Sequence, residues 1–230
     1  MGQQSGSQIV GLLKASHFGP TVLVVGITFV LSLTQFSASD SLFIAFAILL
    51  GQFFVGWSND LIDFPRDKAA SRVKKPLVAG TITQATLRIS IGIALLSALI
   101  VSLISPLGVN GTAIHFLGLL SATAYNLKLK STLLSLAPYV VSFGALPWAI
   151  YAAAGSKPPT WIVLGFIIFA SAFHFLNVLK DIDSDIAQGV MGLPQVLGRR
   201  KSIAMALLLA GLGVLVVVLE ISKTGSIKFT

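Results

Sequence analysis

Seven long apolar segments separated by short polar stretches make up most of the chain. They cover about Thr21–Phe36, Ser41–Trp57, Leu87–Leu107, Thr112–Leu127, Thr132–Ala154, Thr160–Leu179 and Ile203–Ile221, and the fourth fits least well. A membrane-spanning helix needs about 20 mainly apolar residues. A transmembrane β-barrel would show short alternating segments instead. The pattern therefore predicts an all-α, polytopic membrane protein, a transmembrane bundle of about seven helices.

Composition supports this prediction and excludes other classes. Hydrophobic residues make up 55% of the 230 residues and charged residues only 10%, and the mean hydropathy is +0.90. The polar N-terminal stretch, Met1–Ser16, has a single cation, Lys14, and does not resemble a signal peptide. The chain has no cysteine, which excludes disulfides and thiolate metal sites.

The net charge of +8 is arranged for a membrane rather than for nucleic acid. If the N-terminus is inside, 13 of the 16 Lys and Arg residues fall on that side, and only Lys157, Lys223 and Lys228 fall on the other. The positive-inside rule then predicts an integral protein of the cell membrane with a cytoplasmic N-terminus. The loops after the second and sixth apolar segments are placed in the cytoplasm too.

Six of the eight acidic residues lie in two patches 118 positions apart. The patches read Asn59-x3-Asp63-x3-Asp67 and Asn177-x3-Asp181-x3-Asp185. Superposed from their asparagines, they agree at eight of 22 positions, including the pairs Pro76/Pro194 and Gly80/Gly198. Acidic side chains beside membrane segments are costly and usually functional. The repeat suggests two related halves, or convergence on one ligand geometry.

Helical geometry relates the members of each patch. A spacing of four advances a helix by about 400°, so Asn59, Asp63 and Asp67 share one face, which Asp60 adjoins. Pro65 is expected to kink or break this helix.

The same geometry, applied to the second patch, gives a matching stripe of Asn177, Asp181 and Asp185. Asp183 would point about 240° away from Asn177, so we do not expect it to be a ligand.

Carboxylate and amide oxygens are ligands for a hard cation, Mg²⁺ before Ca²⁺ or Mn²⁺. Mg²⁺ often binds substrate phosphates as well, so two facing stripes describe a clamp for a diphosphate. Nearby cations could bind phosphate oxygens directly: Arg66, Lys68, Arg72, Lys74, Lys75, Lys128 and Lys130. The alternative is that the acids only solvate loops and pair with these cations, but two patches with one phase favour a site.

These residues resemble a known family. Asn59 to Asp67 is similar to the N-D-x-x-D-x-x-x-D motif of the UbiA superfamily of intramembrane prenyltransferases, and Arg72 to Gly80 (RVKKPLVAG) resembles the segment that follows it. Asp181-x3-Asp185-x3-Gly189, followed by Leu193-Pro194 and Gly198, resembles the family's second aspartate motif. Tyr125 with Lys128 and Lys130 resembles the tyrosine-lysine element between the motifs.

The resemblance implies a helical bundle around a central cavity, a polyprenyl diphosphate donor, and Mg²⁺ that ionises it. Carried over to this chain, the metal set is Asn59, Asp63, Asp67, Asp181 and Asp185, the four aspartates being the catalytic residues, with Asp60 in support. Asn177 joins the set through the internal repeat rather than the family pattern. Diphosphate contacts fall to Arg72, Lys75, Tyr125, Lys128 and Lys130, with the two lysines competing for one role.

Some features of the chain leave alternatives open. The family has nine helices, so residues 1–230 are interpreted as a single domain that could lack the last two. The acceptor is expected to be small, with a quinone-type aromatic as the default. His17, just before the first apolar segment, has no assigned role, and His174 is interpreted as a hydrogen-bonded structural residue rather than a base.

Two rival functions remain. A CDP-alcohol phosphotransferase also uses aspartates and a divalent metal, but its D-G-x2-A-R run is missing from this sequence. A cation-coupled transporter would place its acids near mid-membrane on broken helices, whereas these lie at the ends of apolar segments.

Overall fold

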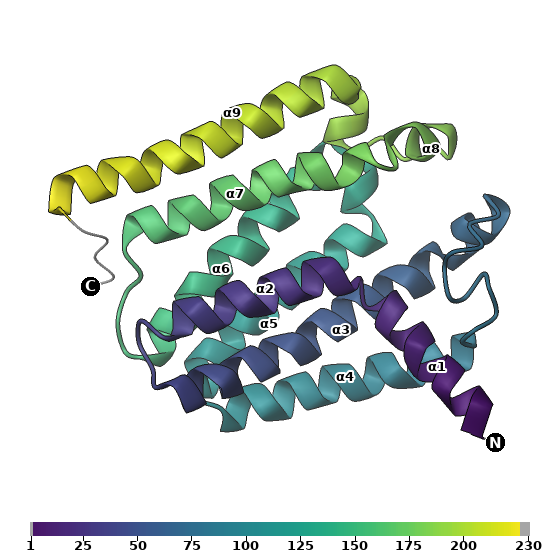
Figure 1. Ribbon diagram of the computed structural model, residues 1–230, viewed down its shortest axis with the longest axis horizontal. Coiled ribbons are helices and arrows are strands. Elements are labelled where there is room, and N and C mark those ends of the chain that lie inside the picture. The colour runs from purple at the N-terminus through teal and green to yellow at the C-terminus, as the bar shows by residue number, and fades with distance from the viewer. Residues whose placement is uncertain (1, 226–230) are drawn as a thin grey trace. The chain divides into compact units, whose positions relative to one another are not determined.

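The computed structural model describes residues 2–225, which are helical with no strand. Nine α-helices and two 3-10 turns occur in this part of the chain (Figure 1). They are α1 (Gly2–Ala15), α2 (Phe18–Ser32), α3 (Ala38–Ala69), α4 (Gln84–Ile104), α5 (Gly108–Leu127), η1 (Leu129–Ser131), η2 (Leu133–Leu136), α6 (Ala137–Ala153), α7 (Thr160–Leu179), α8 (Ile182–Ala187) and α9 (Leu193–Thr224). The all-α prediction is confirmed, and the seven predicted segments correspond to α2 to α7 and α9.

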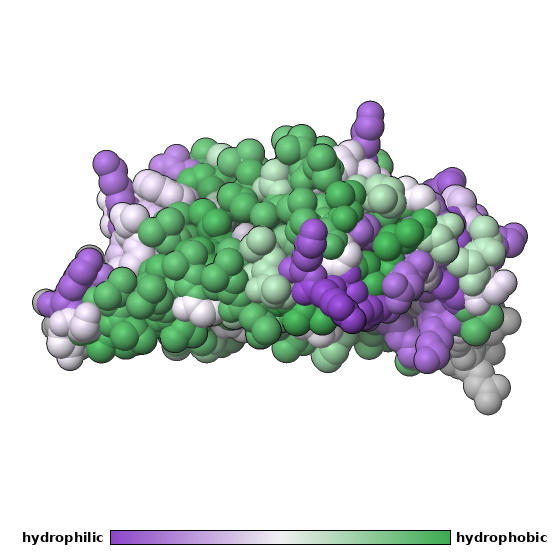
Figure 2. All heavy atoms as spheres, turned by 90° about the horizontal axis from the view of Figure 1, so that it is seen from above, coloured by the Kyte–Doolittle hydropathy of each residue, from purple (hydrophilic) through white to green (hydrophobic). Residues whose placement is uncertain are grey.

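Five of the described helical stretches are long and apolar enough to cross a membrane: α3, α4, Leu133–Ala153, α7 and Leu193–Lys223. The pair Gln8–Ala15 and α2, bent by 66°, would make a sixth, whereas α5 is not among them. Large apolar side chains stay exposed on these helices, such as Leu207 and Leu208 of α9, each 67% exposed. Figure 2 shows a face covered mainly by apolar side chains. Such surfaces suit lipid, so the chain is an integral membrane protein.

The chain divides into two compact units, Met1–Thr112 and Ala113–Thr230. In the first unit α3 packs against both α2 and α4, and in the second α7 packs against both α6 and α9. Each unit therefore places the helix that leads into an acid patch between the long helices before and after it.

Helix α3 is long enough to project beyond the apolar core of a membrane. Its 32 residues correspond to about 48 Å at 1.5 Å per residue, against about 30 Å of hydrocarbon. Ser37 caps its start by accepting a hydrogen bond from the Asp40 amide at 3.2 Å. Pro65 lies inside the helix, which continues to Ala69. Of the kink or break expected at Pro65, the break is therefore not present.

A small apolar core supports the loop between α3 and α4. Ala15 of α1, Leu77 and Ile82 of the loop, and Leu87 of α4 are buried together, with Trp57 of α3 packed against them. Burial of these side chains fixes the loop that carries Arg72 and Lys75 against the end of α3.

Candidate functional site

The first acid patch occupies the last turns of α3. Asn59, Asp60, Asp63 and Asp67 all lie on this helix, as the spacing predicts. Asp60 and Asp67 are only 3% and 2% exposed, and the Asp63 side chain is 12% exposed. Buried carboxylates need charged or hydrogen-bonding partners, because desolvation otherwise disfavours their ionised form.

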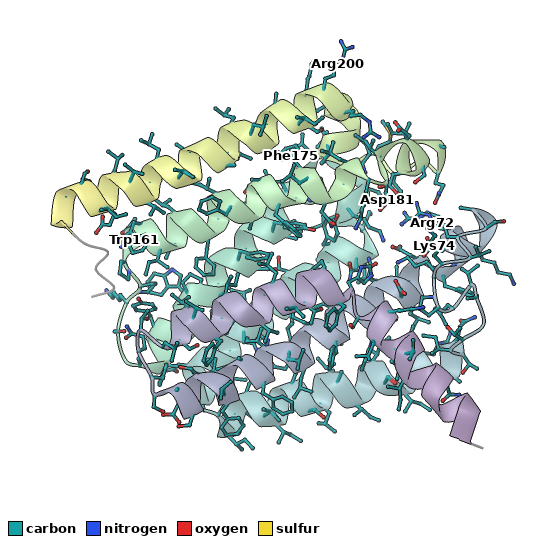
Figure 3. The ribbon with its side chains drawn as sticks, viewed as in Figure 1. Arg72, Lys74, Trp161, Phe175, Asp181 and Arg200 are labelled. Atoms are coloured by element: carbon teal, nitrogen blue, oxygen red, sulfur yellow. The ribbon has the colours of Figure 1, made fainter. Side chains whose placement is uncertain are left out.

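Cations supply those partners. Lys75 Nζ lies 2.6 Å from Asp60 Oδ1, and Arg72 Nη1 lies 3.2 Å from Asp67 Oδ1. Both cations come from the loop after α3, where Figure 3 shows the side chains of Arg72 and Lys74. Asp63 pairs with Arg66 one turn along α3, at 3.1 Å.

The second patch lies across a helix break, which corrects the prediction of a continuous matching stripe. Asn177 belongs to α7, which ends at Leu179. Asp181 precedes α8 with φ −112° and ψ 0°, outside helical geometry, and lies at the junction of the two helices (Figure 3). Of these three residues only Asp185 lies within α8, whose six residues are followed by Gly189 with φ +76°.

The acids of α8 have different neighbours. Gln195, buried at the start of α9, donates a hydrogen bond to Asp185 Oδ2 at 2.9 Å. The Asp183 side chain is 82% exposed and lies 2.7 Å from Arg199. The amide of Gln195 therefore orients Asp185, while Asp183 pairs with a cation at the surface.

Asn177 is held by a cluster of aromatic side chains. The Tyr139 hydroxyl shares hydrogen bonds with Asn177 and Tyr125, and the two tyrosine rings meet edge to face at 5.4 Å. His174 packs on Tyr139 at 4.5 Å and hydrogen bonds to Ser135 at 3.2 Å. This is the hydrogen bond expected of a structural histidine, and His174 is fully buried.

The two candidate lysines differ in their surroundings. Lys128 precedes η1 and is exposed, whereas Lys130 lies within η1 and is half-buried. A methyl group at Gly192 would lie 2.5 Å from the Lys130 carbonyl oxygen, so the Lys130 backbone touches the segment after the second patch. Ser135 fastens the same segment by accepting a hydrogen bond from the Leu193 amide at 2.9 Å.

The carboxylate and amide oxygens of the patches suit Mg²⁺, but within residues 2–225 they do not form a preassembled metal site. Among residues 2–225, no three His, Cys, Asp or Glu side chains are close enough together to hold a metal ion. The carboxylate and amide oxygens are nevertheless ligands that Mg²⁺ prefers, and Mg²⁺ often takes only one or two protein carboxylates. The charge pair of Asp67 with Arg72 would have to exchange for metal contacts.

Sequence reasoning missed several residues that touch the patches. Tyr139 lies outside every recognised motif. Gln195 directly follows Leu193-Pro194 but is not one of the motif's defined positions, so no sequence signal pointed to either residue. The sequence pattern assigns His17 no role, yet its Nε2 lies 3.1 Å from Asp60 Oδ1. A contact across 43 positions depends on how α1 and α2 pack, which periodicity does not give.

The fold and the patches together define a class: a helical integral membrane protein in which each unit carries an aspartate-rich patch at the end of a membrane helix. The family model described as the UbiA prenyltransferase family matches residues 19–227. The chain therefore belongs to this family, whose members are prenyltransferases. None of the curated proteins matches the sequence significantly.

Solved structures show the same fold at low sequence identity. A UbiA homologue from Aeropyrum pernix K1 gives a TM-score of 0.76 at 18% identity, covering 91% of this chain and 81% of that one. A homologue from Archaeoglobus fulgidus bound to DMAPP and Mg²⁺ gives 0.73 at 15%, covering 90% and 75%. A structure titled for digeranylgeranylglyceryl phosphate synthase gives 0.69 at 18%, covering 93% and 77%.

Proposed function

We propose that this chain, as one catalytic domain over residues 1–230, transfers a polyprenyl group from a polyprenyl diphosphate to a small acceptor with Mg²⁺. The first patch carries this proposal: three carboxylates end one membrane helix, and each pairs with a cation suited to bind phosphate. Structures of the A. fulgidus homologue contain Mg²⁺ with DMAPP or with GPP, which supports the same donor class here.

The metal ligands in this proposal are the side chains of Asn59, Asp63, Asp67, Asp181 and Asp185, with Asp60 and Asn177 in support. Bound there, Mg²⁺ would supply positive charge to the diphosphate that leaves when the allylic carbon–oxygen bond breaks.

Arg72 and Lys75 have a second role in this proposal. Without substrate they neutralise Asp67 and Asp60. Once Asp67 shares its charge with Mg²⁺, the Arg72 guanidinium can donate hydrogen bonds to phosphate oxygens. The Lys75 ammonium has three N–H donors, so it can bind phosphate while it stays paired with Asp60. Tyr125, Lys128 and Lys130 are the proposed phosphate contacts of the second unit.

The proposed acceptor is a quinone-type aromatic compound. An electron-rich ring can attack the allylic cation through carbon and lose its proton afterwards, so it needs no strong base beforehand. Glycerol phosphates are the alternative to test, because one similar structure is titled for digeranylgeranylglyceryl phosphate synthase.

We also propose that the N-terminus and both patches face the cytoplasm, as the distribution of cations favours. The absence of cysteine makes this simple to test with single cysteines at Ser71 and Ser156. A membrane-impermeant maleimide added to intact cells should label Ser156→Cys only. Labelling of Ser71→Cys alone would reverse the orientation.

The decisive experiment is an acceptor screen with radiolabelled geranyl diphosphate and longer donors, using purified protein with Mg²⁺ or with EDTA. Wild type should form a prenylated product only with Mg²⁺, and Asp63→Ala should lose more than about 100-fold of the turnover, as expected when charge stabilisation is removed. Asp183→Ala is the matched control, since it removes an exposed acid outside the proposed ligand set.

Two results would contradict the proposal. Equal turnover by Asp63→Ala and wild type would reject the metal site. Ion flux in liposomes without any cleavage of prenyl diphosphate would favour the transporter, and transfer from CDP-alcohols would favour the phosphotransferase.

A further inference from the structure

The junction between α1 and α2 lies against the patch-bearing end of α3. Trp57 of α3 donates a hydrogen bond from Nε1 to the Leu12 carbonyl at 2.9 Å. One residue earlier on α3, a methyl group at Gly56 would lie only 2.7 Å from the Ser16 carbonyl oxygen, so the two backbones are in close contact. His17 completes the junction by donating from Nε2 to Asp60 Oδ1 at 3.1 Å.

His17 has a backbone conformation that costs free energy. Its φ of 54° and ψ of 56° are left-handed, and among the described residues Ser71 is the other non-glycine residue with positive φ. A side chain with a β-carbon is unfavourable there and persists when the surroundings hold it. Glycine would adopt this backbone conformation at a lower cost. A histidine at this position therefore suggests that its side chain has a role.

Asp60 connects the imidazole to a cation of the patch. Its Oδ1 accepts from both His17 Nε2, at 3.1 Å, and Lys75 Nζ, at 2.6 Å. Asp60 is buried, whereas the Lys75 side chain is 26% exposed. The lysine ammonium can therefore face a ligand while the carboxylate behind it remains fixed.

We propose that His17 is a positioning residue of the first patch: it orients Asp60, which in turn holds the Lys75 ammonium for the diphosphate of the donor. This inference rests on the proposed function and refines the role of Asp60, which acts through Lys75. A lysine on its four-carbon stem is a flexible point charge, and fixing it in advance lowers the entropy lost when the diphosphate binds.

The alternative explanation is that His17 only joins α1 and α2 at their bend and has no effect on Asp60. His17→Gly separates the two, because glycine adopts positive φ readily while the hydrogen-bond donor to Asp60 is lost. His17→Gln tests rescue, since its amide can present an N–H donor at a similar reach. Ser71→Gly is the matched backbone control, because it relieves the other left-handed residue without removing a contact with Asp60.

The experiment measures KM and kcat for geranyl diphosphate with saturating Mg²⁺ and acceptor, and the apparent melting temperature in detergent. We expect His17→Gly to melt no lower than wild type yet to raise KM about tenfold, the size of effect typical of groups behind the direct ligands, with kcat changed less. His17→Gln should recover most of the loss, and Ser71→Gly should match wild type.

A double-mutant cycle tests the route through Lys75. If His17 acts through that ammonium, adding His17→Gly to Lys75→Ala should raise KM no further, whereas independent effects would multiply. Wild-type KM in His17→Gly, or multiplied effects in the double mutant, would overturn the inference while leaving the proposed function intact. No turnover by wild type with any prenyl diphosphate would overturn both.

Discussion

The two acid patches have the same spacing of side chains but different local structures. The first continues along one helix through Pro65 to Ala69, so its carboxylates stand on successive turns. The second crosses from α7 to α8 at Asp181. The same spacing of acidic residues can therefore occur on different backbone conformations. A helical wheel describes only the first patch.

What the two regions share is the segment after the patch. The aligned prolines Pro76 and Pro194 each lie shortly before a glycine with positive φ, Gly80 at 70° and Gly198 at 77°. A long helix follows each glycine: α4 begins at Gln84, and α9 continues beyond its kink at Gly198. Because the aligned glycines both have positive φ, the similarity extends beyond the acidic residues. This favours two related halves over convergence.

The two patches also differ in how their carboxylates are compensated. Asp67 is almost fully buried and pairs with a guanidinium, whereas Asp185 is half-buried and accepts from the neutral amide of Gln195. Changing a carboxylate to an amide should therefore affect the folded state of the first patch more than that of the second.

The largest predicted effect compares Asp67→Asn with Asp185→Asn. Both should reduce turnover more than about 100-fold, because each removes a proposed metal ligand. Only Asp67→Asn should lower stability, by about 1–3 kcal/mol, since Arg72 loses its charged partner. For a chain of this size that is roughly 2–12 °C, measurable as apparent melting temperature in detergent.

The new amide at position 185 keeps an oxygen that can accept from Gln195, which is why we expect little change in stability there. An equal loss of melting temperature in both variants would show that the two patches are compensated alike. Full turnover by Asp185→Asn would remove the second patch from the proposed metal set.

The parts predicted from sequence are those fixed by local chemistry. Apolar runs located the long helices, and a spacing of four placed Asn59, Asp63 and Asp67 on one helix. The parts that could not be predicted depend on packing. A proline can persist within a helix when tertiary contacts hold the chain, as at Pro65, so propensity alone suggests a break that is not present.

The break in the second patch and the residues that contact both patches also depend on packing and could not be predicted from the sequence. Asp181 adopts a non-helical conformation at a site where the sequence has no glycine or proline. Gln195 reaches Asp185 across 10 positions, and His17 reaches Asp60 across 43. Contacts of this kind are set by where neighbouring helices lie, which a single sequence does not encode in any period.

A smaller predicted effect compares two glycines at which backbones touch. A methyl group would lie 2.7 Å from the Ser16 carbonyl oxygen in Gly56→Ala, and 2.5 Å from the Lys130 carbonyl oxygen in Gly192→Ala. Both must displace backbone, so each should lose about 1–3 kcal/mol and roughly tenfold in kcat/KM, because small displacements of an active site cost rate.

The control is Gly92→Ala in α4, where nothing lies within 4 Å of the added methyl group. Alanine is the better helix former, so this variant should be neutral or slightly stabilised. If Gly56→Ala behaved like Gly92→Ala, the close contact of the α1–α2 junction with α3 would be wrong, and the comparison would rest on the second region alone.

The smallest predicted effect tests the shared segment after each patch. Gly80→Ala and Gly198→Ala force a β-carbon onto positive φ, at positions where the space around the glycine is open. Each should therefore lose about 1–2 kcal/mol from backbone strain alone, seen as a similar fall in apparent melting temperature. Both should also raise KM for geranyl diphosphate a few-fold, because they shift the loops beside the patches.

The control is Gly155→Ala, at φ +71° after α6. It should show the same fall in melting temperature without a change in KM for geranyl diphosphate. If Gly80→Ala and Gly198→Ala instead differed in both melting temperature and KM, the two segments would share only the positive φ of their glycines. The repeat would then be better explained by convergence than by related halves.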